Sequence, residues 1–239
     1  MTRYGVNRLG PVVPAYFHPA IQPMDWLTLG GAAGAVRLVV LNMASGPGRQ
    51  RDHTYADTID RLLDAGAPIA GYVDTDYGHR PSADLLSEIA RYRDWYRVSS
   101  VFLDRVPSGI EHVPRYRALA AACRRAGMDL VAFNHGTHPV WDYAEHADLL
   151  GTFEGPFRSF AELDVPSWVH DFPPGRFFHL LYDCPPTLVR TVGRLATERN
   201  VGCVYRTEAT GANPWRGLPT GFPQAQLIGD RYRPSPMFP

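Results

Sequence analysis

Short apolar runs that end in a polar or acidic residue recur along this chain. The run SSVFLD ends at Asp104, DLVAFN ends at Asn134, and LLGTFE ends at Glu154. Segments with helical spacing of apolar residues separate such runs, and this alternation is typical of a parallel β-sheet. Eight strands are predicted in total: Pro11–Phe17, Val36–Asn42, Pro68–Asp74, Ser100–Asp104, Asp129–Asn134, Leu149–Glu154, Arg176–Asp183 and Val201–Thr207. Because chemistry in these sheets lies beyond the carboxyl ends of the strands, the polar strand ends form the candidate site.

The segments between the strands predict helices that lie in the right places for strand–helix units. The clearest are Tyr55–Ala65, Ala83–Trp95, Val113–Ala126 and Pro185–Arg199. Proline near a helix start and glycine just past its end are the expected boundary signals, as at Pro114 and Gly127. The helical pattern is weakest after the first, fifth and sixth strands.

A single (β/α)8 TIM barrel formed by residues 1–239 is the simplest architecture for eight strand–helix units. No Ser/Gly-rich linker or change in composition divides the chain. An open, doubly wound sheet is the main alternative, and it would place the site in a switch-point crevice. After Thr207 the chain is rich in Pro and Gly, which predicts an irregular C-terminal tail. We expect this tail to fold over one barrel end and to bury Trp215, Phe222 and Phe238.

Composition excludes several classes of function. The 24 basic and 24 acidic residues give zero formal net charge, which argues against binding to a nucleic-acid backbone. All 24 basic residues are arginine, so Schiff-base aldolase chemistry and pyridoxal phosphate anchoring, which need a lysine amine, are excluded. Three unpaired cysteines and an N-terminus without an apolar signal segment predict a cytoplasmic protein, or a secreted one if a leader has been removed. No apolar run reaches the roughly 18 residues of a membrane span.

The strand ends carry side chains that suit sugar chemistry. They are Tyr16, His18, Asn42, Asp74, Asp104, Arg105, Asn134, His135, Glu154, Tyr182 and Thr207, and the aromatic residues Tyr77 and Trp215 are candidates for stacking on a sugar ring. Glycoside hydrolysis needs two carboxyl groups. Asp104 and Glu154 close the fourth and sixth strands, and alternate strands of a barrel contribute to one interior layer. The same two residues also fit helix N-caps or ion-pair partners of Arg105 and Arg158.

Other candidate chemistry in the sequence is weaker. His135 and His138 are the only close histidine pair, but they lie in a loop without a metal-binding motif, so no metal is expected. Cys184 lacks the context of a Cys–His nucleophile and is expected to pack in the core. The segment SGPG at 45–48 lacks the glycine spacing and the lysine of a phosphate loop. We therefore expect no cofactor.

Seven segments, taken in order, resemble the spherulin-4-like family, which is grouped as glycoside hydrolase family 135. They are VPAYFHP, LNMASGPG, GYVDTDYGHR, YRDWYRVSSVFLD, FNHGT, TFEG and NPWRGLP, and they run from about residue 12 to about residue 222. The resemblance implies a TIM barrel that cleaves α-1,4-linked galactosamine polymers, with Asp104 and Glu154 as the reacting carboxylates and a retaining outcome. It also implies that Asn42, Tyr77, Asn134 and Thr207 line the sugar site.

The chain departs from that family after the fourth strand, where the usual Asp-Glu pair is Asp104-Arg105. A regular strand with Asp104 inward would turn Arg105 outward, but the loop that starts here can break the alternation, so we expect the guanidinium at the pocket rim. Because arginine grips carboxylates and phosphates, an intracellular lyase, isomerase or cyclase acting on an anionic metabolite is the second hypothesis. A carbohydrate-binding pseudoenzyme is the third. We expect a small-molecule or oligosaccharide substrate, and neither nucleic acid nor a membrane as partner; the oligomeric state is left open.

Overall fold

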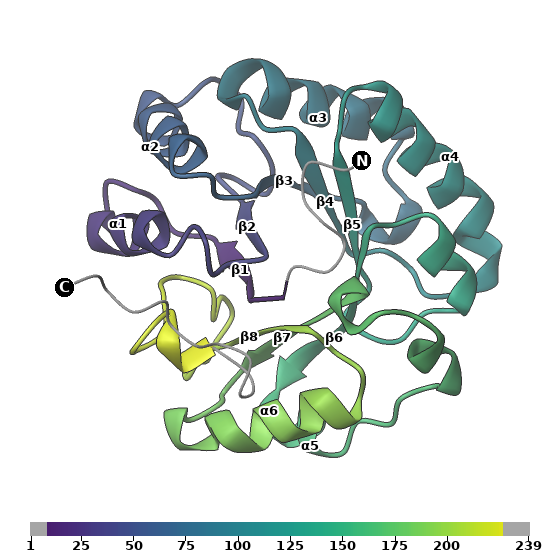
Figure 1. Ribbon diagram of the computed structural model, residues 1–239. Coiled ribbons are helices and arrows are strands. Elements are labelled where there is room, and N and C mark those ends of the chain that lie inside the picture. The colour runs from purple at the N-terminus through teal and green to yellow at the C-terminus, as the bar shows by residue number, and fades with distance from the viewer. Residues whose placement is uncertain (1–8, 227–239) are drawn as a thin grey trace.

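Eight parallel strands form a ring at the centre of the molecule (Figure 1). The computed structural model describes residues 9–226. The strands are β1 (Val12–Ala15), β2 (Leu38–Leu41), β3 (Ile69–Asp74), β4 (Ser100–Asp104), β5 (Leu130–Asn134), β6 (Leu149–Pro156), β7 (Phe177–Tyr182) and β8 (Cys203–Arg206). They follow one another in chain order around the ring, and β8 lies against β1. This arrangement confirms the predicted (β/α)8 barrel and excludes the open sheet.

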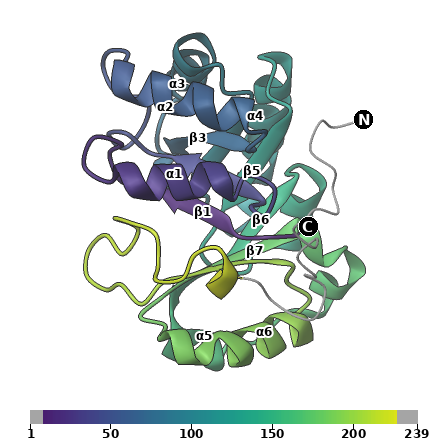
Figure 2. The ribbon, with the colours of Figure 1, turned by 60° about the vertical axis from the view of Figure 1, so that its left-hand side comes forward.

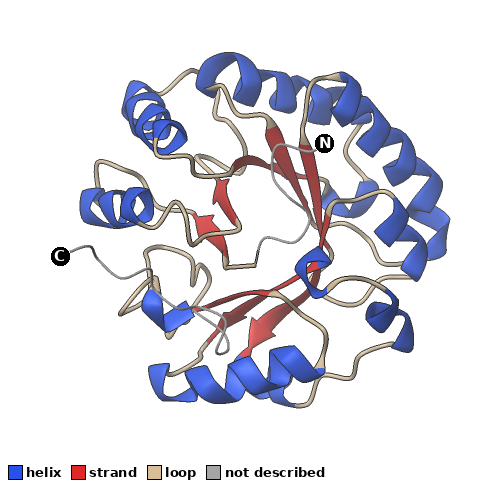
Figure 3. Ribbon diagram, in the orientation of Figure 1, coloured by secondary structure: helices blue, strands red, loops and turns tan. Residues whose placement is uncertain are grey.

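The helices lie outside the ring of strands (Figure 3). The α-helices are α1 (Pro23–Gly31), α2 (His53–Asp64), α3 (Ser82–Tyr96), α4 (Val113–Arg125), α5 (Phe157–Ala161) and α6 (Val189–Glu198). Short 3-10 turns occur at Asp76–Gly78, Ile110–His112, Trp141–Glu145, Ser167–Asp171, Pro174–Arg176, Pro186–Leu188 and Gln224–Gln226. Across residues 9–226 no helix has both the length and the apolar character needed to span a membrane.

The three weak helix predictions have different outcomes. After β5 only the 3-10 turn Trp141–Glu145 forms, and after β6 the helix α5 is five residues long. After β1, however, α1 has nine residues, starts at Pro23 and buries Trp26 and Leu29. Its Gly30-Gly31 end and its exposed apolar residues obscure the amphipathic pattern in the sequence.

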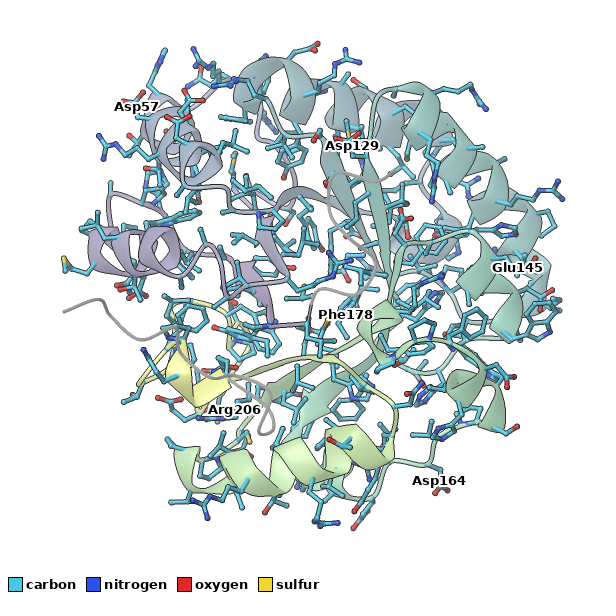
Figure 4. The ribbon with its side chains drawn as sticks, in the orientation of Figure 1. Asp57, Asp129, Glu145, Asp164, Phe178 and Arg206 are labelled. Carbon is cyan, nitrogen blue, oxygen red and sulfur yellow. The ribbon has the colours of Figure 1, made fainter. Side chains whose placement is uncertain are left out.

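Side-chain alternation divides the strand residues between the barrel interior and the layer under the helices. Aromatic rings fill the interior, where Phe102 contacts both Tyr72 and Phe178 with centroid distances of 6.3 and 5.6 Å. Phe178 lies near the centre of the ring in Figure 4. Since Tyr72 and Phe102 are paired in the β3–β4 register, and Asp74 and Asp104 are paired two positions later, these carboxylates face the same interior at the strand ends.

One irregularity decides the direction of Glu154. In the β6–β7 ladder Gly151 pairs with Phe178 but Phe153 pairs with His179, so Thr152 is an extra residue in β6. Gly151 and Glu154 are three positions apart and would face opposite sides of a regular strand. The bulge at Thr152 absorbs one position and brings Glu154 back to the interior side. On the outer side the Thr152 hydroxyl is hydrogen-bonded to Nε2 of His179 at 2.9 Å.

The segment after β8 folds back against α1, which both views show (Figures 1 and 2). The backbone N–H of Leu218 donates to Oδ2 of Asp25 at 2.8 Å. The side-chain amide of Gln226 pairs with both backbone groups of Arg206, accepting from its N–H at 2.8 Å and donating to its carbonyl at 2.9 Å, and so satisfies part of the β8 edge. Trp215 and Phe222 are buried as expected. The prediction for Phe238 lies outside the described residues.

Candidate active site

Three of the predicted site residues meet at the carboxyl end of the barrel. Asp104 ends β4, Asn134 ends β5 and Glu154 lies near the end of β6. The Nδ2 atom of Asn134 donates to Oδ1 of Asp104 at 2.7 Å and to Oε2 of Glu154 at 2.8 Å. Asn134 itself is 3% exposed, so its amide is fixed between the two acids. The strand order thus brings residues that are 50 positions apart in the sequence into one hydrogen-bonded cluster.

This shared nitrogen sets the separation of the two carboxyl groups. Because both accepting oxygens lie within 2.8 Å of Nδ2, the distance between them is at most about 5.5 Å. This upper limit on the distance between the nearest oxygens is compatible with the roughly 5–5.5 Å between the carboxyl groups of retaining glycosidases and is shorter than the roughly 6.5–9.5 Å of inverting ones. The geometry is therefore suited to attack by one carboxylate while the other handles the proton.

The two acids have different surroundings. The pKa of Glu154 is raised to about 7, mainly by burial and then by the charge of Asp104, while the contacts with Asn134 and Trp215 act in the opposite direction. Burial also raises the pKa of Asp104, but hydrogen bonds from Tyr72 and Asn134 favour its ionised form. The Tyr72 hydroxyl donates to Oδ2 of Asp104 at 2.8 Å. Glu154 is thus the group poised to carry a proton near neutral pH.

Aromatic side chains enclose the two acids. Tyr16 packs edge-on against Tyr72 at 5.5 Å, and burial together with the charges of Asp104 and Glu154 raises the pKa of its hydroxyl. Trp215 comes from the segment after β8 and packs against Tyr182, at 6.1 Å between ring centroids. These walls are apolar surfaces beside polar groups, a combination typical of sugar-binding sites.

A second cluster lies next to Asp104 at the end of β3. Nη1 of Arg105 donates to Oδ2 of Asp74 at 2.8 Å, and Nη2 of the same guanidinium donates to Oδ1 of Asp76. The guanidinium also lies over the ring of Tyr77, 4.8 Å from its centroid. Arg105 has a φ of +55°, which breaks the strand alternation and lets its side chain turn toward β3.

Three further predicted residues lie at strand ends but serve local structure. Both ring nitrogens of His18 are engaged, Nδ1 by the N–H of Ala20 and Nε2 by Asp52. Oδ1 of Asn42 accepts from the backbone N–H of Gly46 and closes the following turn. Thr207 is buried, and its hydroxyl accepts from the backbone N–H of Ala209. Within residues 9–226, none of the three is hydrogen-bonded to Asp104 or Glu154.

His135 packs between the barrel and the helices and does not join the acid cluster. Its Nδ1 is hydrogen-bonded to the carbonyl of Pro107 at 3.0 Å, and its ring lies 4.6 Å from that of Tyr143. Asn134 points inward, so its neighbour on β5 must point outward. Burial lowers the pKa of His135 to about 3, so the ring is neutral.

The metal-site and cysteine-nucleophile candidates also lack the surroundings that such chemistry needs. Within residues 9–226, no group of three or more His, Cys, Asp or Glu side chains is arranged to hold a metal ion. Cys184 is buried, and burial raises the pKa of its thiol to about 11, which is the opposite of an activated nucleophile.

Sequence reasoning missed two contributors to the site. Tyr72 is not among the predicted site residues, although it faces the same side of β3 as Asp74, two positions later. Asp76 follows the strand end in a loop, where sequence spacing does not indicate direction. Its pairing with Arg105 depends on positive φ values at Asp76 and Arg105 that no pattern announced.

Comparison with known proteins gives consistent matches. A family model described as spherulation-specific family 4 matches residues 11–226. Spherulin-4 of Physarum polycephalum is 26% identical over 167 residues, which are 68% of this chain and 49% of that protein. The chain therefore spans about half the length of this curated relative.

Several solved structures share the architecture. Aspergillus clavatus Sph3 in complex with GalNAc has a TM-score of 0.76 at 21% identity, covering 90% of this chain and 95% of that one. A chitinase from Chromobacterium violaceum has a TM-score of 0.55 at 13% identity, covering 86% and 97%. The chitinase ChiC from Aspergillus fumigatus has a TM-score of 0.51 at 13% identity, covering 94% and 95%. At these identities the likeness shows a common fold.

Proposed function

Because the chain belongs to spherulation-specific family 4, we propose that it is a glycoside hydrolase acting on an amino-sugar-containing glycan through two carboxyl groups, in the manner of a galactosaminidase. The observation that carries the proposal is the pair Asp104 and Glu154, held by one Asn134 nitrogen with their accepting oxygens at most about 5.5 Å apart. The GalNAc bound to Sph3 and the chitinases with the same architecture support a sugar as the substrate class.

In the proposed mechanism Glu154 is the general acid and Asp104 the nucleophile. Protonated Glu154 donates its proton to the leaving glycosidic oxygen while the carboxylate of Asp104 attacks the anomeric carbon from the opposite face. The bond between the anomeric carbon and the leaving oxygen breaks, and a glycosyl ester of Asp104 forms. Glu154, now ionised, takes a proton from water, and that water cleaves the ester with overall retention. Tyr72 and Asn134 stabilise the Asp104 carboxylate before attack and as it is released.

The test uses N-acetylated and free α-1,4-linked galactosamine oligosaccharides as probes. We expect turnover by the native protein, and a loss of about 10²–10⁴ in kcat for Asp104→Asn and for Glu154→Gln. The matched controls are Asp60→Asn and Glu198→Gln, whose parent carboxylates are in exposed ion pairs with Arg97 and Arg194. Proton NMR of the first product should show the anomer of the substrate.

The outcomes separate the three hypotheses. Normal turnover by both site variants would exclude the two-carboxylate mechanism. Sugar binding by the native protein without turnover would favour a pseudoenzyme. Neither binding nor turnover of any amino-sugar probe would contradict the proposal and favour the enzyme acting on an anionic metabolite.

A further inference from the structure

The loop after β3 has an unusual backbone at the rim of the barrel. Asp76 and Tyr77 have φ values of +47° and +51°, and Gly78 follows at +87°. Non-glycine residues rarely adopt this conformation, and two in succession persist only where the surroundings enforce it. Half of the Tyr77 surface is exposed even so. The strained backbone therefore presents an aromatic ring to solvent at the end of the barrel that holds the carboxylates.

Contacts from Arg105 hold this loop in place. Its carbonyl accepts from the backbone N–H of Tyr77 at 2.9 Å and from the hydroxyl of Thr75 at 2.9 Å. Its guanidinium pairs with Asp74 and Asp76, and it covers one face of the Tyr77 ring. A guanidinium is planar and can donate to two carboxylates in its plane while its face stacks on an aromatic ring, a geometry that the compact lysine ammonium does not reproduce.

The positive charge of Arg105 is balanced by carboxylates within this cluster. Two carboxylates, Asp74 and Asp76, face one guanidinium, so the cluster has no surplus positive charge to offer an anionic ligand. This pairing runs against the idea that Arg105 grips an anionic metabolite. It leaves the exposed ring of Tyr77 as the feature available to a substrate.

We propose that Arg105 is a positioning residue that, through Asp74 and Asp76, holds the Tyr77 ring at the barrel mouth as a stacking surface for a substrate sugar. The proposal rests on the proposed function and assigns a role to the residue at which this chain departs from its family. A sugar presents an apolar face of C–H groups, and an electron-rich ring with one face supported by a cation is suited to stack against it.

The first experiment does not depend on any sugar. Amide hydrogen exchange is measured by NMR for the native protein and for Arg105→Gln. We expect Tyr77, Gly78 and His79 to exchange at least about tenfold faster in the variant, while strand β3 is unchanged. The matched control is Arg97→Gln: Arg97 has a similar φ of +57° and an ion pair with Asp60, at the end of α3. Unchanged exchange in Arg105→Gln would overturn the positioning role even if the protein hydrolyses no glycan.

The second experiment measures kcat and KM on the galactosamine oligosaccharides. We expect Arg105→Gln and Tyr77→Ala each to raise KM by about tenfold with kcat within about twofold, which is the effect of losing one stacking contact. The double variant should resemble Tyr77→Ala alone, because both changes remove the same contact. Multiplied KM effects in the double variant would contradict the proposal.

The family-like variant Arg105→Glu gives the sharpest contrast. It places a third carboxylate beside Asp74 and Asp76, so we expect its KM to be higher than that of Arg105→Gln on both N-acetylated and free-amine oligosaccharides. Arg105→Lys, which keeps the charge but not the planar guanidinium, should have a KM between that of the native protein and that of Arg105→Gln. A gain of activity for Arg105→Glu on free-amine oligosaccharides would show that Arg105 selects substrates by charge, and it would overturn the positioning role.

Discussion

Replacing Asn134 with alanine tests whether one amide controls the protonation of both reacting acids. The change removes the hydrogen bonds of 2.7 and 2.8 Å to Asp104 and Glu154. A hydrogen bond to a charged group contributes about 1.5–3 kcal/mol, and one pKa unit corresponds to about 1.4 kcal/mol. Since the bond favours ionised Glu154, its loss should raise the pKa of that residue from about 7 by roughly one to two units.

Repulsion between the acids acts in the same direction. Two charges about 5.5 Å apart repel by about 3 kcal/mol at an effective dielectric constant of about 20. In the native protein the Asn134 amide lies between them and offsets part of this repulsion. In Asn134→Ala no amide offsets the repulsion, and the state with Glu154 protonated and Asp104 ionised is favoured.

The assay is the pH dependence of kcat/KM, with a carboxyl NMR titration of Glu154 as a measurement that needs no substrate. Since Glu154 must be protonated to act as the acid, activity should fall as the pH rises through its pKa. In Asn134→Ala this alkaline limb should move upward by about one to two pH units, at a lower maximal rate. Glu154→Gln assigns the NMR signal. An alkaline limb that stays in place or moves to lower pH would refute the proposed role of Asn134.

Three further predictions concern the same cluster. Tyr72→Phe removes a donor from Asp104 alone, so the acidic limb of the pH–rate profile should move upward while the alkaline limb stays within about half a unit. Glu154→Gln should stabilise the fold above pH 7 by about 2–3 kcal/mol and have little effect near pH 4. The reason is that the pKa of Glu154 is higher in the folded protein, so the native protein loses stability as the pH rises from the unfolded-state pKa to about 7. Urea unfolding at both pH values measures this difference. Gly151→Ala places a Cβ against Oδ1 of Asn134 and the ring of Phe178 and should destabilise the fold by about 1–3 kcal/mol. The control Gly34→Ala, whose Cβ meets open space, should leave the stability unchanged. Equal unfolding midpoints of the two variants would contradict the packing described for Gly151.

The fold was predictable because its signals are local. Each strand is a short apolar run, and the polar residue that ends it marks the end of burial, so β4 was placed residue for residue at Ser100–Asp104. The placement of Asp104 and Glu154 at the same end of the barrel followed from their positions at the ends of parallel strands. The Asn134 bridge between them did not, because it depends on the relative register of three strands and on the bulge in β6.

The direction of a side chain at the site was hardest to predict where it depends on irregular backbone or on the residue next to a strand end. The position of His135 after a strand end predicts a site residue, but Asn134 before it points inward and His135 therefore points outward. For Arg105 a break in the alternation was expected, but its positive φ, which no sequence pattern indicates, turns it toward Asp74 and Asp76. Its partner Asp76 was missed for the same reason.

The bulge in β6 makes the site depend on the number of residues as well as on their identity. Thr152 takes no part in the proposed chemistry, and its hydroxyl faces His179 on the outer side of the strand. Deleting Thr152 would keep every side chain of the acid cluster in the chain, but the loss of one position would turn Glu154 toward the helices. The same set of side chains can therefore be kept and the arrangement lost through a single codon deletion, so the number of residues between Gly151 and Glu154 matters as much as their identity.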